Sequence, residues 1–401
     1  MPTADSNTIT PCSTTAIFDW LFTDGRRIES TSGFLRELGH RINDNGGDVD
    51  RLMLSLMTLN PLIVGTADFW FRSTDTTNTV KASHNVRISE RYIGSPLQAI
   101  YETRKRVRRR LDDLPEDAHR AYTELAEDGY TDYLALPVMF GERTDPGAAI
   151  VFCTRRPGGF SDADIESYRR IRDYLAPVLE VHALRHQSRS LMNTYVGPRT
   201  SEKVLAGMVK RGDADIINAA LWFSDLRNFT QVTETCASRD VLQMLNDYFE
   251  FIAAAVGAHG GEILRFIGDA MLIVFPIGEG MSCEAACRAA LESALDAQST
   301  IATLNFQRRR HGQAQIEFGV GLNIGEVVYG NVGAPDRLDF TVMGPTVNRT
   351  ARLESLTKEL DRDVLFSKEF SEYIDAPTEF LGDFAMKGID VAQPVYALLP
   401  E

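Results

Sequence analysis

The segment that most limits the fold is residues 261–275, GEILRFIGDAMLIVF, in which two short apolar runs flank Gly268 and Asp269. Glycine accepts the positive φ that a two-residue turn can demand, and each flanking run has the length of a strand. The segment therefore predicts a β-hairpin with Asp269 on the rim of a rigid turn. Aspartate at a turn is common for turn chemistry alone, so its function depends on the surrounding elements.

The elements around this hairpin predict an α+β domain. Strands are predicted at 216–226, 316–330, 338–343, 363–367, 380–386 and 394–399, and helices at 241–260, 282–304 and 345–357. The order β-α-β-β-α-β followed by further elements is that of a ferredoxin-like sheet with helices on one face. In this order the first strand, which ends near Asp225, lies beside the hairpin. Asp225 and Asp269 are then within reach of one pair of ions, and paired carboxylates suit Mg²⁺ in two-metal phosphoryl chemistry.

Four segments resemble the successive signatures of class III nucleotidyl cyclases, the adenylate and guanylate cyclase catalytic domain. They are LWFSDLRNFT, GGEILRFIGDAMLIVFP, VGLNIGEVVYGNVG and RLDFTVMGPTVNRTARLES. They occur in the family's order and extend over nearly all of residues 213–400. The resemblance implies an adenylate cyclase that converts ATP to cyclic AMP and pyrophosphate.

The resemblance also implies the roles of individual residues. Asp225 and Asp269, with the backbone carbonyl of Leu226, are expected to bind two Mg²⁺ ions, for which Mn²⁺ can substitute. Asn348 matches the asparagine that orients the ribose, and Arg352 matches the arginine that stabilises the transition state. Independently of the family, their i, i+4 spacing places both on one face of a helix.

Three further residues are expected to contact the triphosphate. Phe229 and Thr230 open the helix after the first strand, where free N–H groups can hold phosphates. Lys387 resembles a lysine that contacts the same phosphates. In this family the metal-binding and ribose-binding residues of one site come from different chains, so the resemblance implies a homodimer with two sites at its interface.

Base selection is where the sequence departs from the family. Arg265 stands where lysine is usual, and Thr341 matches the threonine found in a large bacterial subgroup. Arginine keeps the charge but changes the geometry. ATP is the expected substrate because Thr341 belongs to an adenylate-type pairing, and a guanylate or pyrimidine nucleotide cyclase is the alternative. A second departure, Gly344-Pro345, is expected to affect only the helix entry.

Strand alternation places Arg265 on the same face as Ile263 and Ile267, in an otherwise apolar stretch. A cation there needs a partner, because a buried unpaired charge is costly. The partner is either the purine edge, with Thr341 beside it, or a nearby acid such as Glu262 or Asp339.

The N-terminal region, about residues 18–185, resembles a GAF domain, which implies ligand binding or dimerisation without naming a ligand. Helices are expected at 34–44, 50–59 and from Ser161-Asp162-Ala163-Asp164 onward, and strands at 62–71, 133–141 and 147–154. The short turns favour an antiparallel sheet. Cys153, on a central strand, is expected to serve packing rather than a chromophore or redox sensing.

The expected organisation is a flexible tail at 1–17, a GAF-like sensor or dimerisation domain at 18–185, a helical linker at 186–212 and the catalytic domain at 213–401. The linker contains a break at Gly197-Pro198.

A formal net charge of −14 argues against a nucleic-acid partner. The basic run Arg104–Arg110 is interpreted as a solvated helix face compensated by the acids that follow it. Five scattered cysteines favour free thiols in a reducing compartment, hence a cytoplasmic protein. No apolar run reaches the roughly 20 residues of a membrane span, and no signal peptide is recognisable. The one-turn pairs Cys283/Cys287 and His182/His186 lack further metal ligands and are set aside.

A different kind of function remains open from the sequence. A degenerate cyclase domain could act only as a dimerising or nucleotide-binding regulatory module. The presence of both aspartates, Asn348 and Arg352 argues against this alternative.

Overall fold

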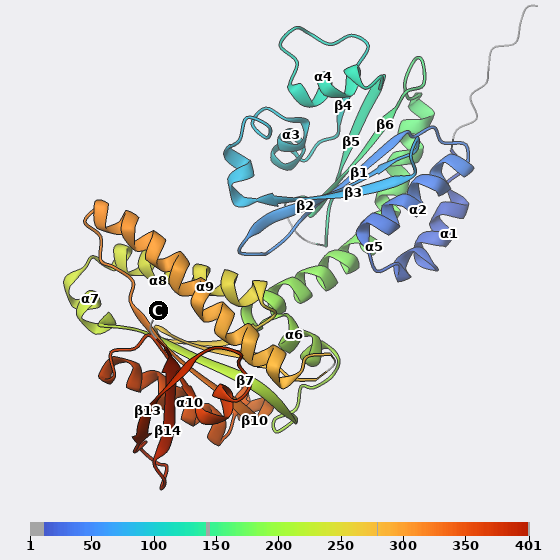
Figure 1. Cartoon of the computed structure of the whole chain (residues 1–401). Coiled ribbons are helices and arrows are strands. Elements are labelled where there is room, and N and C mark those ends of the chain that lie inside the picture. The colour runs from blue at the N-terminus through green and yellow to red at the C-terminus, as the bar shows by residue number, and fades with distance from the viewer. Residues whose placement is uncertain (1–11, 142–144, 279, 400–401) are drawn as a thin grey trace, which may run out of the picture. The chain divides into compact units, whose positions relative to one another are not determined.

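The computed structural model describes residues 12–141, 145–278 and 280–399. It divides into two compact units, Met1–Thr194 and Tyr195–Glu401 (Figure 1). Within the described ranges, no helix combines the length and the apolar character needed to cross a bilayer.

The N-terminal unit is built on a six-stranded antiparallel sheet in the order β3-β2-β1-β6-β5-β4. The strands are β1 (Arg51–Met57), β2 (Ile63–Phe71), β3 (Thr76–Ser83), β4 (Val107–Arg110), β5 (Asp132–Val138) and β6 (Ala148–Thr154). The predicted antiparallel sheet is confirmed, and its two central strands, β1 and β6, carry alternating apolar side chains that fill cores on both faces.

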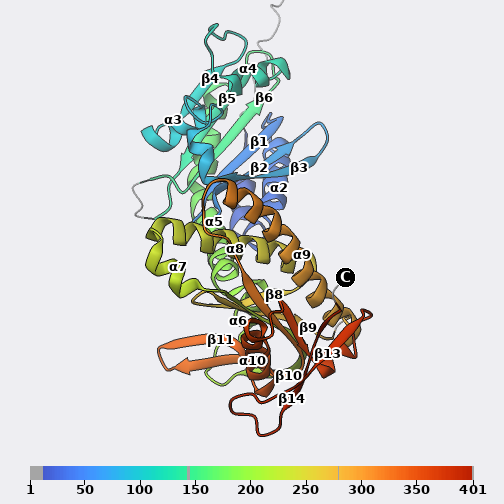
Figure 2. The ribbon, with the colours of Figure 1, turned by 60° about the vertical axis from the view of Figure 1, so that its left-hand side comes forward.

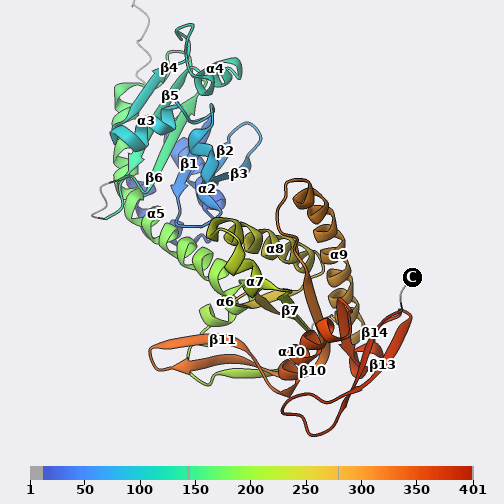
Figure 3. The ribbon, with the colours of Figure 1, turned by 90° about the vertical axis from the view of Figure 1, so that its left-hand side faces the viewer.

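Helices cover both faces of this sheet (Figure 3). One core is formed with α1 (Thr15–Phe22), α2 (Thr31–Asp44) and α5 (Asp162–Val196), and the other with α3 (Pro96–Thr103) and α4 (Arg120–Glu127). Two short 3-10 helices, η1 (Gly25–Arg27) and η2 (His84–Ile88), join these elements. Cys153 is fully buried in the second core, as its strand position predicted.

Two predictions for this unit are wrong. Residues 50–59, expected to be helical, contain strand β1, in which Leu52, Leu54 and Leu56 alternate with less buried residues and both edges pair with neighbouring strands. Two-sided pairing satisfies every backbone group, which outweighs the helical preference of leucine and methionine. The basic run is likewise partly strand β4 rather than a helix.

The charges of the basic run are compensated, as predicted, although largely by acids outside the adjacent loop. Arg108 pairs with the fully buried Asp132 at 2.8 Å, and Arg110 pairs with Asp112. The pair of Arg108 and Asp132 also fixes the backbone, because Asp132 accepts the Phe160 N–H at 3.0 Å.

The predicted flexible tail, residues 1–17, is wrong for its last six residues. Residues 1–11 lie outside the described residues. From Cys12 onward the chain is packed: Cys12 and Ile17 are buried in the first core, and α1 begins at Thr15.

The helix predicted from Ser161 is present as α5. The Ser161 hydroxyl accepts the Asp164 N–H at 3.2 Å, and the Asp164 carboxylate accepts the Ser161 N–H at 2.9 Å, which is a capping box. The helix continues to Val196 and ends at Gly197, whose φ of 85° is left-handed, before Pro198 opens α6 (Pro198–Leu205). The predicted break at Gly197-Pro198 is therefore confirmed.

The C-terminal unit contains an eight-stranded sheet whose central order is β10-β7-β9-β8, extended by β12, β14 and β13, with β11 paired to β10 (Figure 2). The strands are β7 (Ala214–Leu226), β8 (Glu262–Ile267), β9 (Ala270–Pro276), β10 (Phe318–Ala334), β11 (Arg337–Met343), β12 (Val364–Ser367), β13 (Thr378–Phe384) and β14 (Gln393–Leu398). Numbered by appearance, the central strands have the order 4-1-3-2 of a ferredoxin-like sheet, as predicted.

Besides α6, the helices of this unit are α7 (Phe229–Thr235), α8 (Ser238–Ala258), α9 (Cys283–Arg310), α10 (Pro345–Glu359) and α11 (Lys368–Ser371). Helices α8 and α9 pack on one face of the sheet, against alternate side chains of β7, β9 and β10. Helix α10 covers the opposite face, with Leu353 and Leu356 against β12 and β14. The prediction that the helices pack on one face of the sheet is therefore correct for α8 and α9. Helix α10, which follows the ferredoxin-like elements, packs on the second face.

Candidate active site

The two predicted metal aspartates meet at one edge of the central sheet. Asp225 is the penultimate residue of β7, and Asp269 lies in the two-residue turn that joins β8 to β9. Gly268 in that turn has a φ of 67°, the left-handed conformation expected of it. The two carboxyl groups are close enough for the charge of Asp269 to raise the pKa of Asp225.

The electrostatics of this pair favour a bound cation. Burial, and next the charge of Asp269, raises the pKa of Asp225 to about 7. Ionising both carboxyls is costly unless a positive charge lies between them. Among the described residues, no group of three or more His, Cys, Asp or Glu side chains is arranged to hold a metal. Two carboxylates are a suitable ligand set for Mg²⁺. This ion commonly binds one or two carboxylates and completes its coordination shell with water and substrate phosphates.

A third carboxyl group near this pair was missed by the sequence reasoning. Burial, followed by the charge of Asp225, raises the pKa of Glu354 on α10 to about 7, and Arg227 opposes this shift. Glu354 lies over Gly319, the residue that pairs with Asp225 across the sheet. A methyl group on Gly319 would approach the Glu354 Oε1 to 3.0 Å. Gly321, the next residue on this face, meets the Glu354 backbone in the same way, so the two glycines let α10 lie close to the strand.

Asn348 and Arg352 lie together on the exposed side of α10, as their spacing predicted. At about 100° per residue, Arg352 projects roughly 160° away from Glu354 around the helix. Since Glu354 is directed at the sheet beside Asp225, Arg352 is directed away from it. Among the described residues Arg352 forms no ion pair. A single chain therefore does not bring Arg352 to its own aspartate pair.

The remaining predicted phosphate contacts lie on separate segments. Phe229 and Thr230 are the first residues of α7, with Phe229 half-buried against the core and Thr230 exposed. Leu226 has a buried side chain, and its N–H donates to Asp225 Oδ1 at 3.1 Å. Lys387 is exposed in the connection between β13 and β14.

The prediction that Arg265 shares a face of the sheet with both Ile263 and Ile267 is wrong for Ile263. The pairing of β8 with β9 shifts register between Ile263 and Arg265, so these two residues face opposite sides of the sheet. Arg265 is half-exposed rather than buried, and its Nη2 lies 2.6 Å from Oδ2 of Asp339 on β11. The partner is thus one of the two acids considered. The other, Glu262, accepts the Arg199 backbone N–H at 3.1 Å.

Helix α10 begins as expected at the unusual Gly344-Pro345 pair. Pro345 is the first helical residue, and Gly344 has a φ of 138°. Proline at this position lacks only an N–H that would have no partner within the helix. The departure from the family pattern therefore changes the entry into α10 and leaves the spacing of Asn348 and Arg352 intact.

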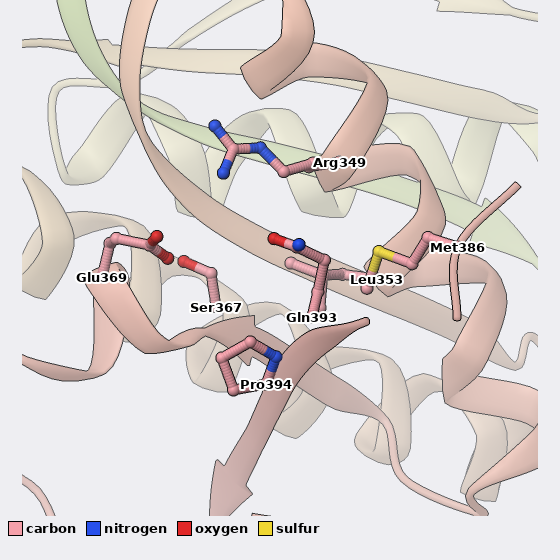
Figure 4. A pocket seen from close by; sticks show the side chains of 7 residues that line it. All are labelled: Arg349, Leu353, Ser367, Glu369, Met386, Gln393 and Pro394. Atoms are coloured by element: carbon pink, nitrogen blue, oxygen red, sulfur yellow. The ribbon is translucent and has the colours of Figure 1, made fainter. Parts of the chain in front are cut away.

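A small pocket lies elsewhere in this unit, on the side of α10 that faces β12 and β14 (Figure 4). Its lining residues are Arg349, Leu353, Ser367, Glu369, Met386, Gln393 and Pro394. It contains none of the predicted site residues. Asp225 and Asp269 lie instead at the end of β7 and in the turn between β8 and β9.

Comparison with known proteins identifies the class of this unit. Residues 214–398 match the family described as the adenylate and guanylate cyclase catalytic domain. The C-terminal unit therefore resembles a cyclase catalytic domain and has the α+β fold that the family resemblance implied.

Individual relatives match slightly less than half of the chain. Adenylate cyclase 1 of Rhizobium meliloti is 32% identical over 181 residues, which is 44% of this chain and 27% of the relative. The adenylate cyclase of Anabaena cylindrica is 29% identical over 193 residues, which is 47% of this chain and 38% of the relative. The chain thus spans well under half the length of these two relatives. The crystal structure of the adenylyl cyclase CyaB from P. aeruginosa is 26% identical and covers 47% of this chain and 96% of its own, with a TM-score of 0.43.

Proposed function

We propose that the C-terminal unit is an adenylate cyclase of the threonine-type subgroup, which converts ATP to 3′,5′-cyclic AMP and pyrophosphate. The observation that carries the proposal is the placement of two sets of polar side chains. One is a pair of carboxylates at the edge of the sheet, and the other is an amide with a guanidinium on the exposed side of α10. Among the residues that the structure describes, Asp225 and Asp269 form a carboxylate pair without a cationic partner, and Asn348 with Arg352 forms an exposed polar face on α10. The matched family and the two adenylate cyclases that resemble this region support the same reaction.

In the proposed reaction the 3′-hydroxyl oxygen of ATP attacks the α-phosphorus in line. A new bond between the 3′ oxygen and the α-phosphorus closes the ring. The bond from the α-phosphorus to the oxygen that bridges it to the β-phosphate breaks, and the hydroxyl proton is released with pyrophosphate. Asp225 and Asp269, with the Leu226 carbonyl, would hold two Mg²⁺ ions. Bound at these residues, Mg²⁺ or Mn²⁺ supplies activation of the hydroxyl and neutralisation of the triphosphate.

The protein residues supply orientation and charge. Arg352 would stabilise the negative charge that develops on the phosphoryl oxygens, since its guanidinium is permanently charged and forms no ion pair in the described part of the chain. Asn348, one helical turn earlier, would orient the ribose. The N–H groups at Phe229 and Thr230, together with Lys387, would hold the β- and γ-phosphates.

We propose further that the active form is a homodimer with two shared sites. Helix geometry supports this, because Arg352 is directed away from the aspartates of its own chain while Glu354 is directed toward them. A second copy related by two-fold symmetry would present its Arg352 and Asn348 to the first chain's aspartates, and the reverse. A monomer would lack half of each site.

The N-terminal unit would then be a GAF-like regulatory domain. An antiparallel sheet with helices on both faces supports this proposal. Both cores are filled by aromatic and aliphatic side chains, such as Trp70 and Phe152 in the first and Tyr133 and Val151 in the second. Such filling favours a dimerisation module, and a small ligand that regulates the cyclase is the other mode the resemblance implies.

The identity of the nucleotide base is the most detailed part of the proposed function. Thr341 on β11 supports ATP, because its hydroxyl can accept the adenine N6–H. Arg265 keeps GTP, or a pyrimidine nucleotide, as the alternative substrate, since a guanidinium donates equally well to adenine N1 and guanine O6. A degenerate, purely regulatory domain is disfavoured by the presence of Asp225, Asp269 and Arg352 together.

The experiment is to incubate the full chain with each of the four nucleoside triphosphates and Mg²⁺ or Mn²⁺, and to identify products by mass spectrometry. The expected result is cyclic AMP and pyrophosphate in equal amounts from ATP, with a lower yield from GTP. Asp269→Ala serves as the inactive control and Glu250→Gln, an exposed residue of α8, as the active one. Absence of any cyclic nucleotide from a folded dimer would refute the proposed activity.

A further inference from the structure

The feature of interest is the ion pair between Arg265 on β8 and Asp339 on β11. The two side chains meet at 2.6 Å while both remain partly exposed, at 48% and 40%. Strand β11 belongs to the long β10–β11 arm, in which Thr341 pairs with Gly330 and Asp339 with Val332. Asp339 and Thr341 are two residues apart on one strand, so their side chains project from the same side. The ion pair therefore places Arg265 on the side of β11 that carries Thr341, a residue that is buried within the single chain.

An arginine at this position needs such an anchor more than a lysine would. The guanidinium is planar, and its donors are useful only when the plane is correctly oriented, whereas an ammonium group donates in any rotation. The contact between Nη2 and Asp339 restrains the Arg265 side chain, and Arg265 has no other ionic partner among the described residues.

We propose, resting on the cyclase function above, that Asp339 is a positioning residue for purine recognition. It holds the Arg265 guanidinium beside Thr341, so that the free donors of Arg265 and the hydroxyl of Thr341 form one edge. This edge offers a donor to adenine N1 and an acceptor to the adenine N6–H. Asp339 acts through Arg265 and does not contact the base, because its carboxylate is engaged by the guanidinium.

The pairing of the Asp339 carboxylate with Arg265 also affects the choice between ATP and GTP. A free carboxylate beside the purine would accept the N1–H and N2–H of guanine, which adenine lacks. Pairing with Arg265 removes this acceptor from the edge. The Arg265–Asp339 pair is therefore expected to favour ATP both by orienting a donor and by withholding an acceptor.

The experiment is a double-mutant cycle on the full chain, with KM and kcat for ATP and GTP measured for wild type, Asp339→Ala, Arg265→Ala and the double variant. Asp339→Ala is expected to raise KM for ATP about threefold to tenfold with kcat retained within about twofold, the scale of one partly exposed charged contact. The same substitution in the Arg265→Ala background should leave KM for ATP unchanged. Asp339→Glu should restore part of the loss, since the longer acid can still reach the guanidinium.

Asp336→Ala is the matched control, because it removes the same charge from an exposed position in the turn of the β10–β11 arm. It should behave as wild type. An Asp339→Ala enzyme with wild-type KM for ATP, or an equal effect in both Arg265 backgrounds, would overturn the positioning role while leaving the cyclase activity intact. A wild-type chain without cyclic product would instead overturn both proposals.

Discussion

Replacing Asp225 by asparagine should stabilise the metal-free protein while abolishing its response to metal. The pKa of Asp225 rises from 3.8 to about 7 because of burial and the neighbouring Asp269. In the unfolded chain neither cause operates. Between about pH 4 and pH 7 the folded state therefore binds the proton more strongly than the unfolded state. The free energy of unfolding falls as the pH rises through this window and remains low above it.

The size of the effect follows from the same shift. A pKa raised from 3.8 to about 7 corresponds to about 4 kcal/mol at about 1.4 kcal/mol per pH unit. Asp225 is only partly buried, so solvent screening reduces this figure. We expect Asp225→Asn to stabilise the metal-free protein at pH 8 by on the order of 1–2 kcal/mol. For a domain of this size, that gain is a rise in Tm of about 3–6 °C.

The assay is differential scanning calorimetry of the full chain in EDTA at pH 8 and pH 5, repeated with a titration of Mn²⁺. Wild type should gain Tm with Mn²⁺, and Asp225→Asn should not. At pH 5 the difference between the two proteins should shrink, because the wild-type carboxyl is then protonated. Glu250→Gln, which removes an exposed charge from α8, should match wild type throughout. An Asp225→Asn protein that is no more stable than wild type at pH 8 in EDTA would refute the carboxylate repulsion.

Three further outcomes are expected. Glu354→Gln should weaken Mn²⁺ binding severalfold in calorimetry, since it removes a third negative charge near the site; unchanged affinity would show that Glu354 serves only the fold. Gly321→Ala should cost about 1–3 kcal/mol in urea unfolding, because the added methyl would approach the Glu354 N to 2.5 Å; wild-type stability would contradict the close approach of α10. Asp132→Ala should destabilise the N-terminal unit by on the order of 3 kcal/mol, since Arg108 loses a buried partner; limited proteolysis that leaves this unit intact would count against it.

Much of the catalytic fold was predictable because its signals are local. Gly268 and Asp269 between two apolar runs specify a hairpin whatever surrounds them, and the hairpin is present. Likewise the spacing of Asn348 and Arg352 fixes their common face once the segment is helical, and α10 places them so. These features depend on backbone geometry within a few residues.

The features that sequence reasoning missed depend on partners distant in the chain. A register shift in β8 turns Arg265 away from the face of Ile263, and nothing in the β8 sequence announces it. Asp339 was one of two candidate acids, and only the pairing of β11 with β10 decides between them. The alternating glycines at 319 and 321 indicate that a helix packs closely on this strand, which is a signal that could have drawn attention to Glu354. The sequence does not say which helix this is, because that depends on the tertiary structure.

The N-terminal unit shows the same limit. Leu52, Leu54 and Leu56 fit a short helix or a strand equally well by composition, and pairing on both edges decides for the strand. In the same way, the arginines at 108 and 110 look like a solvated helix face until the strand they occupy meets Asp132. Local propensity was overridden in both places by contacts that the chain makes only when folded.

The shared active site is tested most directly by complementation. Homodimers of Asp225→Ala and of Arg352→Ala should each be inactive with ATP and Mn²⁺. Mixed in equal amounts and allowed to exchange subunits, they should recover about a quarter of wild-type cyclic AMP production, because half of the dimers are then mixed and each mixed dimer has one intact site of two. Mixed dimers that form, as shown by native mass spectrometry, but produce no cyclic AMP would contradict the account.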